Sequence, residues 1–69
     1  MPDVAMTLFN MALLHKDKGE LAEAEEKAKE SLELYQRMAE LSHAAFDKYV
    51  ELAKNLLADI QEARKKPKP

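Results

Sequence analysis

The chain is short, helix-forming in composition and nearly neutral. Its 69 residues are enough for one small domain, and without cysteine no disulfide or thiolate metal site can stabilise it. A composition of 46% hydrophobic and 35% charged residues excludes a disordered chain. The formal charge of −2 argues against a nucleic-acid binder, which needs a basic face.

Features of membrane insertion or export are also missing from the sequence. No segment approaches the ~18 continuous apolar residues of a membrane span. Residues 1–14 lack the basic n-region of a signal peptide. We therefore expect no membrane partner and a cytoplasmic location in the cell that makes the protein. The basic residues 64–68 suit the end of a helix, and any further role is left open.

The first helix is predicted over residues 3–18. Pro2 and Asp3 favour a helix start, and Gly19 is suited to ending it in a left-handed conformation. At about 100° per residue, this helix has two apolar faces. One is predicted at Val4, Leu8, Met11, Ala12 and His15, and the other at Met6, Phe9 and Leu13. A helix that is apolar on two sides must be covered on two sides.

The second helix is predicted over residues 20–41. Its buried stripe is Leu21, Ala24, Ala28, Leu32, Tyr35, Met38 and Ala39, widened by Leu34 and Leu41. A third helix is predicted over residues 44–65. Its apolar arc is Phe46, Tyr49, Val50, Leu52, Ala53, Leu56, Leu57, Ile60 and Ala63. Residues 1–66 then form one helical domain, and residues 67–69 form a frayed tail because proline cannot continue a helix.

The joint between the second and third helices is open to two interpretations. Neither Gly nor Pro stands near Ser42, and the two apolar arcs nearly coincide when the count is carried across it. A single helix over residues 20–65 would span about 70 Å and would need a second chain to cover it. A break near Ser42–His43, with Ser42 as a possible N-cap, gives an antiparallel three-helix bundle, which we favour.

Residues 2–38 resemble one tetratricopeptide repeat of the long type found in kinesin light chains. The resemblance rests on the Gly19 turn and on residues spaced around it, namely Pro2, Asp3, Val4, Ala5, Leu8, Asn10, Ala12, Leu13, Leu14, Ala24 and Glu25. It implies a helical hairpin that acts by contact, with the third helix as a C-terminal packing helix. That family usually has Asn-Asn in its peptide groove, whereas here Phe9 precedes the single Asn10.

A lone repeat is unusual, because such arrays need about three units to bury a continuous core. The loop between repeats, where the family commonly has proline, here reads Ser42-His43 and Asp47-Lys48. Both departures replace groove or loop chemistry by apolar contact and helix propensity. We interpret the chain as a redesigned single repeat, with an excised natural fragment as the alternative.

The sequence offers no arrangement suited to catalysis or to a cofactor. In a hairpin that turns at Gly19, His15 and His43 lie too far apart to share a metal ion. The glutamates lack the Glu-x-x-His spacing of di-metal bundles, and neither Ser31 nor Ser42 has a His–Asp set nearby. We therefore predict no enzyme activity, no metal and no cofactor.

The predicted function is a helical scaffold or self-assembly module. The candidate interface or groove residues are Met6, Phe9, Asn10, Leu13, Leu52 and Leu56. The leading partner is a second copy in a homodimer, and the alternative is a peptide or protein segment in the groove of the first and third helices. The patch of Met6, Phe9 and Leu13 is also suited to seat the third helix, in which case Phe9 is core.

Overall fold

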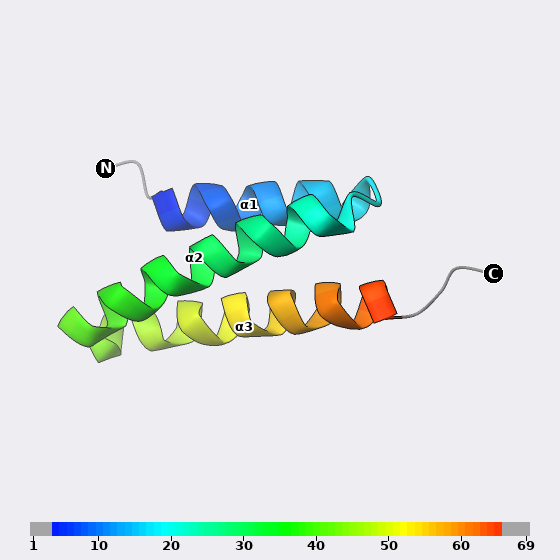
Figure 1. The fold of residues 1–69 in the computed structure, drawn as a ribbon. Coiled ribbons are helices and arrows are strands. Elements are labelled where there is room, and N and C mark those ends of the chain that lie inside the picture. Colours follow the sequence, from blue (N-terminus) through cyan, green and yellow to red (C-terminus); the bar gives the residue numbers. More distant parts are fainter. Residues whose placement is uncertain (1–3, 66–69) are drawn as a thin grey trace.

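The computed structural model describes residues 4–65, which form three helices. They are α1 (Val4–Asp17), α2 (Leu21–Leu41) and α3 (His43–Lys65), joined by two short connections. Figure 1 shows α2 running antiparallel to both neighbours. The prediction of an all-α three-helix bundle is confirmed. The expected helix start at residue 3 and the tail 67–69 lie outside the described residues.

The middle helix, α2, holds the bundle together. Both α1 and α3 pack along α2, whereas α1 and α3 barely touch each other. The Cα atoms accordingly extend over 44 × 20 × 13 Å, which is a flat arrangement. One side of the molecule is therefore open, where α1 and α3 lie beside each other without packing closely.

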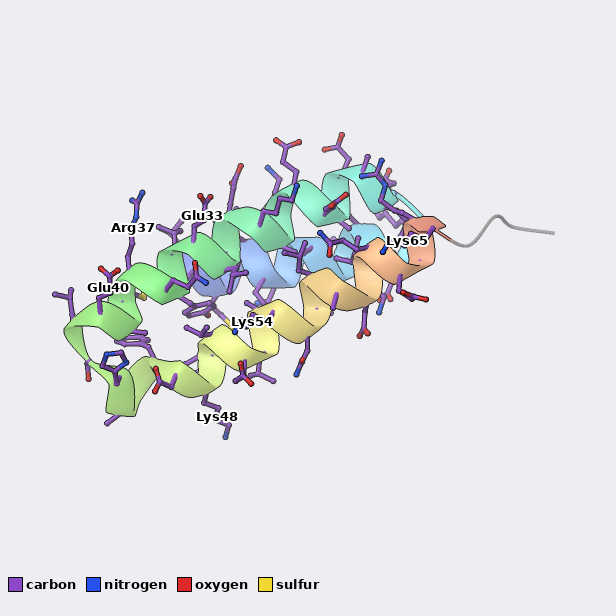
Figure 2. All side chains as sticks on the ribbon, turned by 60° about the horizontal axis from the view of Figure 1, so that its bottom comes forward. Glu33, Arg37, Glu40, Lys48, Lys54 and Lys65 are labelled. Carbon is purple, nitrogen blue, oxygen red and sulfur yellow. The ribbon has the colours of Figure 1, made fainter. Side chains whose placement is uncertain are left out.

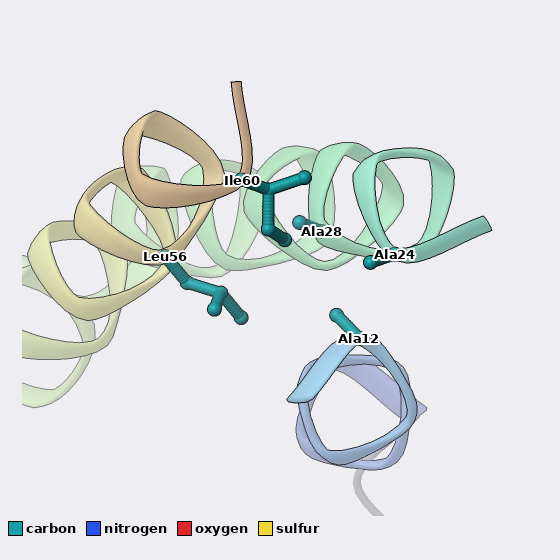
Figure 3. Close-up of a cluster of buried hydrophobic side chains, with 5 residues drawn as sticks. All are labelled: Ala12, Ala24, Ala28, Leu56 and Ile60. Carbon is teal, nitrogen blue, oxygen red and sulfur yellow. The ribbon is translucent and has the colours of Figure 1, made fainter. Parts of the chain in front are cut away.

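Where the helices approach most closely, the core residues are small. One buried cluster contains Ala12, Ala24, Ala28, Leu56 and Ile60, and Figure 3 shows their side chains pointing toward one another. A second cluster contains Ala5, Tyr35 and Ala53. Alanine occupies the contact positions of α1 and most of those of α2, so the two backbones lie close together and larger side chains are placed at the sides.

This arrangement corrects the predicted buried face of α1. Val4 is 59% exposed and Met11 37% exposed, whereas Ala5 and Ala12 are fully buried. Ala12 belongs to the first predicted face and Ala5 to neither face, so the close contact with α2 selects a narrow strip of alanines at the edge of that face. Leu41 was expected to widen the stripe of α2, and it is 89% exposed because α2 ends there.

A buried serine ties α1 to α2. Ser31 is fully buried, and its Oγ donates a hydrogen bond of 2.8 Å to the backbone carbonyl of Ala5. This contact satisfies the hydroxyl in an apolar surrounding, where an unpaired polar group would be costly. The sequence analysis did not place Ser31 in the core.

The turn between α1 and α2 depends on Gly19. Its φ of 82° is the one positive value among the described residues. The Gly19 N–H donates to the carbonyl of Lys16 and the Glu20 N–H to that of His15, which is the Schellman pattern of helix termination. The predicted role of Gly19 as the left-handed residue that ends the first helix is confirmed.

A single residue separates α2 from α3. Ser42 is extended, with φ −155° and ψ 90°, and its N–H donates to the carbonyl of Met38. Its own carbonyl accepts hydrogen bonds from Ala45 and Phe46 at the start of α3. The break expected near Ser42 is therefore present, and the alternative of one continuous helix is wrong.

Replacing Gly19 by alanine should destabilise the protein. A Cβ at positive φ costs about 1–2 kcal/mol, so we expect Gly19→Ala to lower the free energy of unfolding by about that amount. Gly19→Asn should lose less, because asparagine tolerates this conformation. Urea denaturation of the three proteins measures the order, and equal losses for both variants would contradict the role given to φ.

Removing the buried hydroxyl should have a smaller effect. Ser31→Ala deletes one hydrogen bond, while the Ala5 carbonyl keeps its bond within the helix, so a loss of about 1 kcal/mol is expected. Gln36→Ala on the exposed side of α2 controls for helix propensity and should not destabilise the protein. A Ser31→Ala protein as stable as the original would show that the contact contributes nothing net.

Candidate functional site

The open side of the bundle carries a strip of apolar side chains from two helices. We call the apolar strip the set Met6, Phe9 and Leu13 on α1 with Tyr49 and Leu52 on α3. Leu13 is 38% exposed and Leu52 is 43% exposed, while Met6 and Phe9 are half-buried. This side of the molecule can therefore contact another apolar surface.

Aromatic rings form the floor of the strip. The rings of Tyr35 and Tyr49 stack with centroids 5.3 Å apart and an interplanar angle of 14°. Phe46 packs against Tyr49 at 6.4 Å in a tilted arrangement. A cavity of about 20 Å³ lies between α1 and α3, lined by the strip residues except Leu13 together with Tyr35. The floor is thus largely filled, and the accessible part is a shallow depression.

The structure brings together four of the six predicted interface residues. Met6, Phe9, Leu13 and Leu52 lie on the apolar strip. Asn10 is exposed on α1, one turn before Leu13. Leu56 differs, because it is only 6% exposed and belongs to the core cluster around Ala12.

Two tyrosines in this region were assigned only to the core by sequence reasoning. Tyr35 is indeed buried, but Tyr49 is 36% exposed and contributes to the surface of the strip. Its spacing of three residues from Leu52 places the two side chains on one side of α3, which is the signal that could have identified it. Because α1 packs mainly against α2, it does not cover that side of α3.

Phe9 belongs to the core as well as to the strip. Its half-buried side chain packs against both hydrophobic clusters, the one around Ala12 and the one around Tyr35. Phe9 thus helps to seat α3 on α1 and α2, as one of the sequence interpretations held. A substitution of Phe9 would disturb the fold and the surface together, which makes Leu13 and Leu52 the better probes of the surface.

Polar groups near the ends of the helices serve the fold. At the Gly19 turn, Nδ1 of His15 lies 2.7 Å from Oε1 of Glu20. This hydrogen bond is the largest cause that lowers the pKa of Glu20 below its ordinary value, with smaller contributions from the charges of His15 and Lys18. His15 and Glu20 occupy the two positions that frequently make an apolar contact in a Schellman motif.

A second polar contact ties α2 to α3. The Glu25 carboxylate accepts a hydrogen bond of 3.2 Å from Gln61 and another from Arg64, and Lys29 lies 3.7 Å away. The bonds from Gln61 and then Arg64 lower the pKa of Glu25 below its ordinary value, and the charge of Lys29 adds to this. Glu25 therefore pairs with Lys29 within α2 and also bridges α2 to α3.

The described part of the chain shows neither a metal-binding cluster nor a membrane-spanning helix. Within residues 4–65, no set of three His, Cys, Asp or Glu side chains is placed to hold a metal ion. His15 pairs with Glu20, while His43 lies 3.2 Å from Asp47 within α3. Among the described helices, none has both the length and the apolar character needed to cross a membrane.

Comparison with protein-family models, with curated proteins and with solved structures finds no match to the chain. The resemblance to a tetratricopeptide repeat therefore stays a prediction from the residues around Gly19.

The two lowered carboxylate pKa values predict a loss of stability in acid. A lowered pKa in the folded state means that the stabilisation is present above the unfolded value of about 4.5 and is lost as the pH falls through the folded value. The urea midpoint should therefore fall as the pH is lowered through and below about 4.5, and Glu25→Gln should reduce the fall. Glu26→Gln, on the exposed side of α2, is the matched control, and an equal fall in both variants would contradict the assignment to Glu25.

Proposed function

We propose that the chain is a non-catalytic helical scaffold that assembles by burying the apolar strip against a second copy of itself. The carrying observation is that Leu13 and Leu52, from different helices, are both exposed, and that Leu13 lies two turns after Met6, which lines one cavity with Leu52 on the open side of the bundle. A 69-residue chain buries a smaller share of its surface than a larger domain does, and it gains stability from further burial.

The charge distribution supports contact through α1. From Val4 to Leu14 the helix contains no charged residue, and its polar side chains are only Thr7 and Asn10. A neutral helix can be covered by another apolar surface without removing a charge from water. The polar clusters of the bundle, at Glu20 and Glu25, are both engaged in holding helices together.

The position of Phe9 supports an engineered origin, which we propose along with the scaffold role. Where the resembled family has a groove asparagine, this chain has a large apolar side chain that packs against both core clusters. Such a replacement stabilises a lone hairpin with one extra helix and removes a group that would bind a peptide backbone. The exchange suits a structural unit better than a receptor.

A peptide- or protein-binding module is the second candidate. The observation that favours it is the depression between α1 and α3, whose floor is the stacked pair Tyr35 and Tyr49. An amphipathic helix laid along α1 and α3 would cover the same residues as a second copy. The two candidates differ in the mass of the protein alone in solution.

Leu13→Glu tests the proposal, with Leu14→Glu as the matched control. Leu14 is the neighbouring residue and is 55% exposed, but it points away from the strip, so the two variants add the same charge to different faces of α1. Sedimentation equilibrium should show the original chain and Leu14→Glu as dimers, and Leu13→Glu near the monomer mass of 7.9 kDa. Circular dichroism should show all three folded.

An original chain that stays at monomer mass at every concentration would overturn self-assembly. Selection of displayed amphipathic helical peptides would then test the second candidate, with Leu13→Glu used to discard peptides that bind elsewhere. A dimer that survives Leu13→Glu but is lost in Leu14→Glu would place the contact on the other face of α1.

A further inference from the structure

We infer that the second copy binds the apolar strip about a twofold axis that passes between the two α3 helices at the level of residues 53 and 54, so that each α3 lies antiparallel to its equivalent. This inference rests on the proposed function and adds the partner's orientation and register. Three features of the strip lead to it, namely the charges along α3, the position of Leu52, and the spacing of the apolar residues on α1.

Opposite charges flank the strip on α3. Lys48 and Asp59 are eleven residues apart, which places them within about 20° of each other around the helix and about 16 Å apart along it. Both are exposed, and neither makes an ion pair with another residue in the range 4–65. Figure 2 shows Lys48 extending from α3 on the side away from α2. One edge of the strip thus has a cation near one end and an anion near the other.

Such an edge is complementary to itself when it is reversed. An antiparallel second copy, centred midway between Lys48 and Asp59, places each Lys48 opposite the other copy's Asp59. Both contacts form at once, because a twofold contact is the same for both partners. A parallel arrangement in register would instead bring like charges together, which is unfavourable.

The same centre brings the exposed leucine of α3 to its equivalent. Leu52 lies 1.5 residues from the axis, so the two copies of Leu52 are separated by about 4.5 Å along the helices. At this spacing the two side chains can pack against each other across the interface. Leu52 is 43% exposed in the single chain, so burial there removes apolar surface from water.

The residues of α1 are compatible with the same centre. Met6 and Phe9 line one cavity with Tyr49 and Leu52, so this part of α1 lies beside the middle of α3. Reversal about a point between Phe9 and Asn10 sets Met6 of one copy opposite Leu13 of the other, so the apolar residues of α1 meet as well.

Two single charge reversals test this register. Lys48→Asp leaves a chain with acids at both ends of the edge, and Asp59→Lys leaves one with bases at both ends. Each variant alone should dimerise about tenfold more weakly, because two ion pairs become two like-charge contacts. An equimolar mixture should form heterodimers at least as strongly as the original chain dimerises, since every contact again joins opposite charges.

The matched controls are Lys54→Asp and Asp47→Lys. These two variants change the charge in the same way as the test variants, but on the side of α3 that is turned away from the strip. There Lys54 is 3.8 Å from Glu51, and Asp47 is 3.2 Å from His43. Neither variant should dissociate the dimer, and mixing them should produce no preference for heterodimers. Native mass spectrometry with one partner isotope-labelled distinguishes the species, and sedimentation equilibrium gives the affinities.

The outcomes separate the register from the proposed function. Heterodimer preference in the first mixture and none in the control mixture supports the inference. A dimer that depends on Leu13 but shows no preference in either mixture overturns the register and leaves self-assembly standing. An original chain that remains monomeric overturns both. Equal dissociation by Lys54→Asp and Lys48→Asp would place the interface elsewhere on α3 and overturn the inference.

Discussion

The close contact of α1 with α2 through alanine is the constraint on which the rest of the structure depends. Ala5 and Ala12 on α1, with Ala24 and Ala28 on α2, are fully or almost fully buried, and they allow the two backbones to approach closely. Because the contact positions are taken by the smallest apolar residue, the larger side chains of α1 are displaced to either side of α2. One consequence is that Phe9 reaches α3, and another is that Leu13 and Leu14 stay exposed.

Much of this architecture could be predicted from the sequence, and particular residues explain why. Gly19 identified the first turn because a positive φ is accessible to glycine at little cost. The apolar residues of α2 identified its buried side because charged residues occupy the rest of that helix. The break at Ser42 was harder, since no residue type requires it. There the backbone N–H of Ser42 ends α2 and its carbonyl begins α3, through hydrogen bonds that nearly any residue could make.

The errors on α1 have a single physical cause. Helical periodicity reports which residues share a face, but α1 is apolar on nearly all sides between Val4 and Leu14. Periodicity therefore could not decide whether Val4 and Met11, or Ala12 at the edge of their face together with Ala5, would contact α2. Likewise the apolar arc of α3 could be predicted to include Leu56, but the burial of its side chain could not, because that burial depends on how α3 packs against Ala12.

The strip and the core are not separate parts of this molecule. Phe9 packs against both buried clusters and also lines the cavity beneath Tyr49 and Leu52, so the surface that we propose for assembly is the outer layer of the core itself. In a chain this small, much of the apolar surface stays close to solvent, so a residue such as Phe9 stabilises the single copy and also extends the surface open to a second one. Specificity must then come from groups that do not contribute to the core. On the open side of α3 these are the exposed charges at its edge, and it is their order along the helix, rather than the apolar area between them, that would distinguish one partner orientation from another.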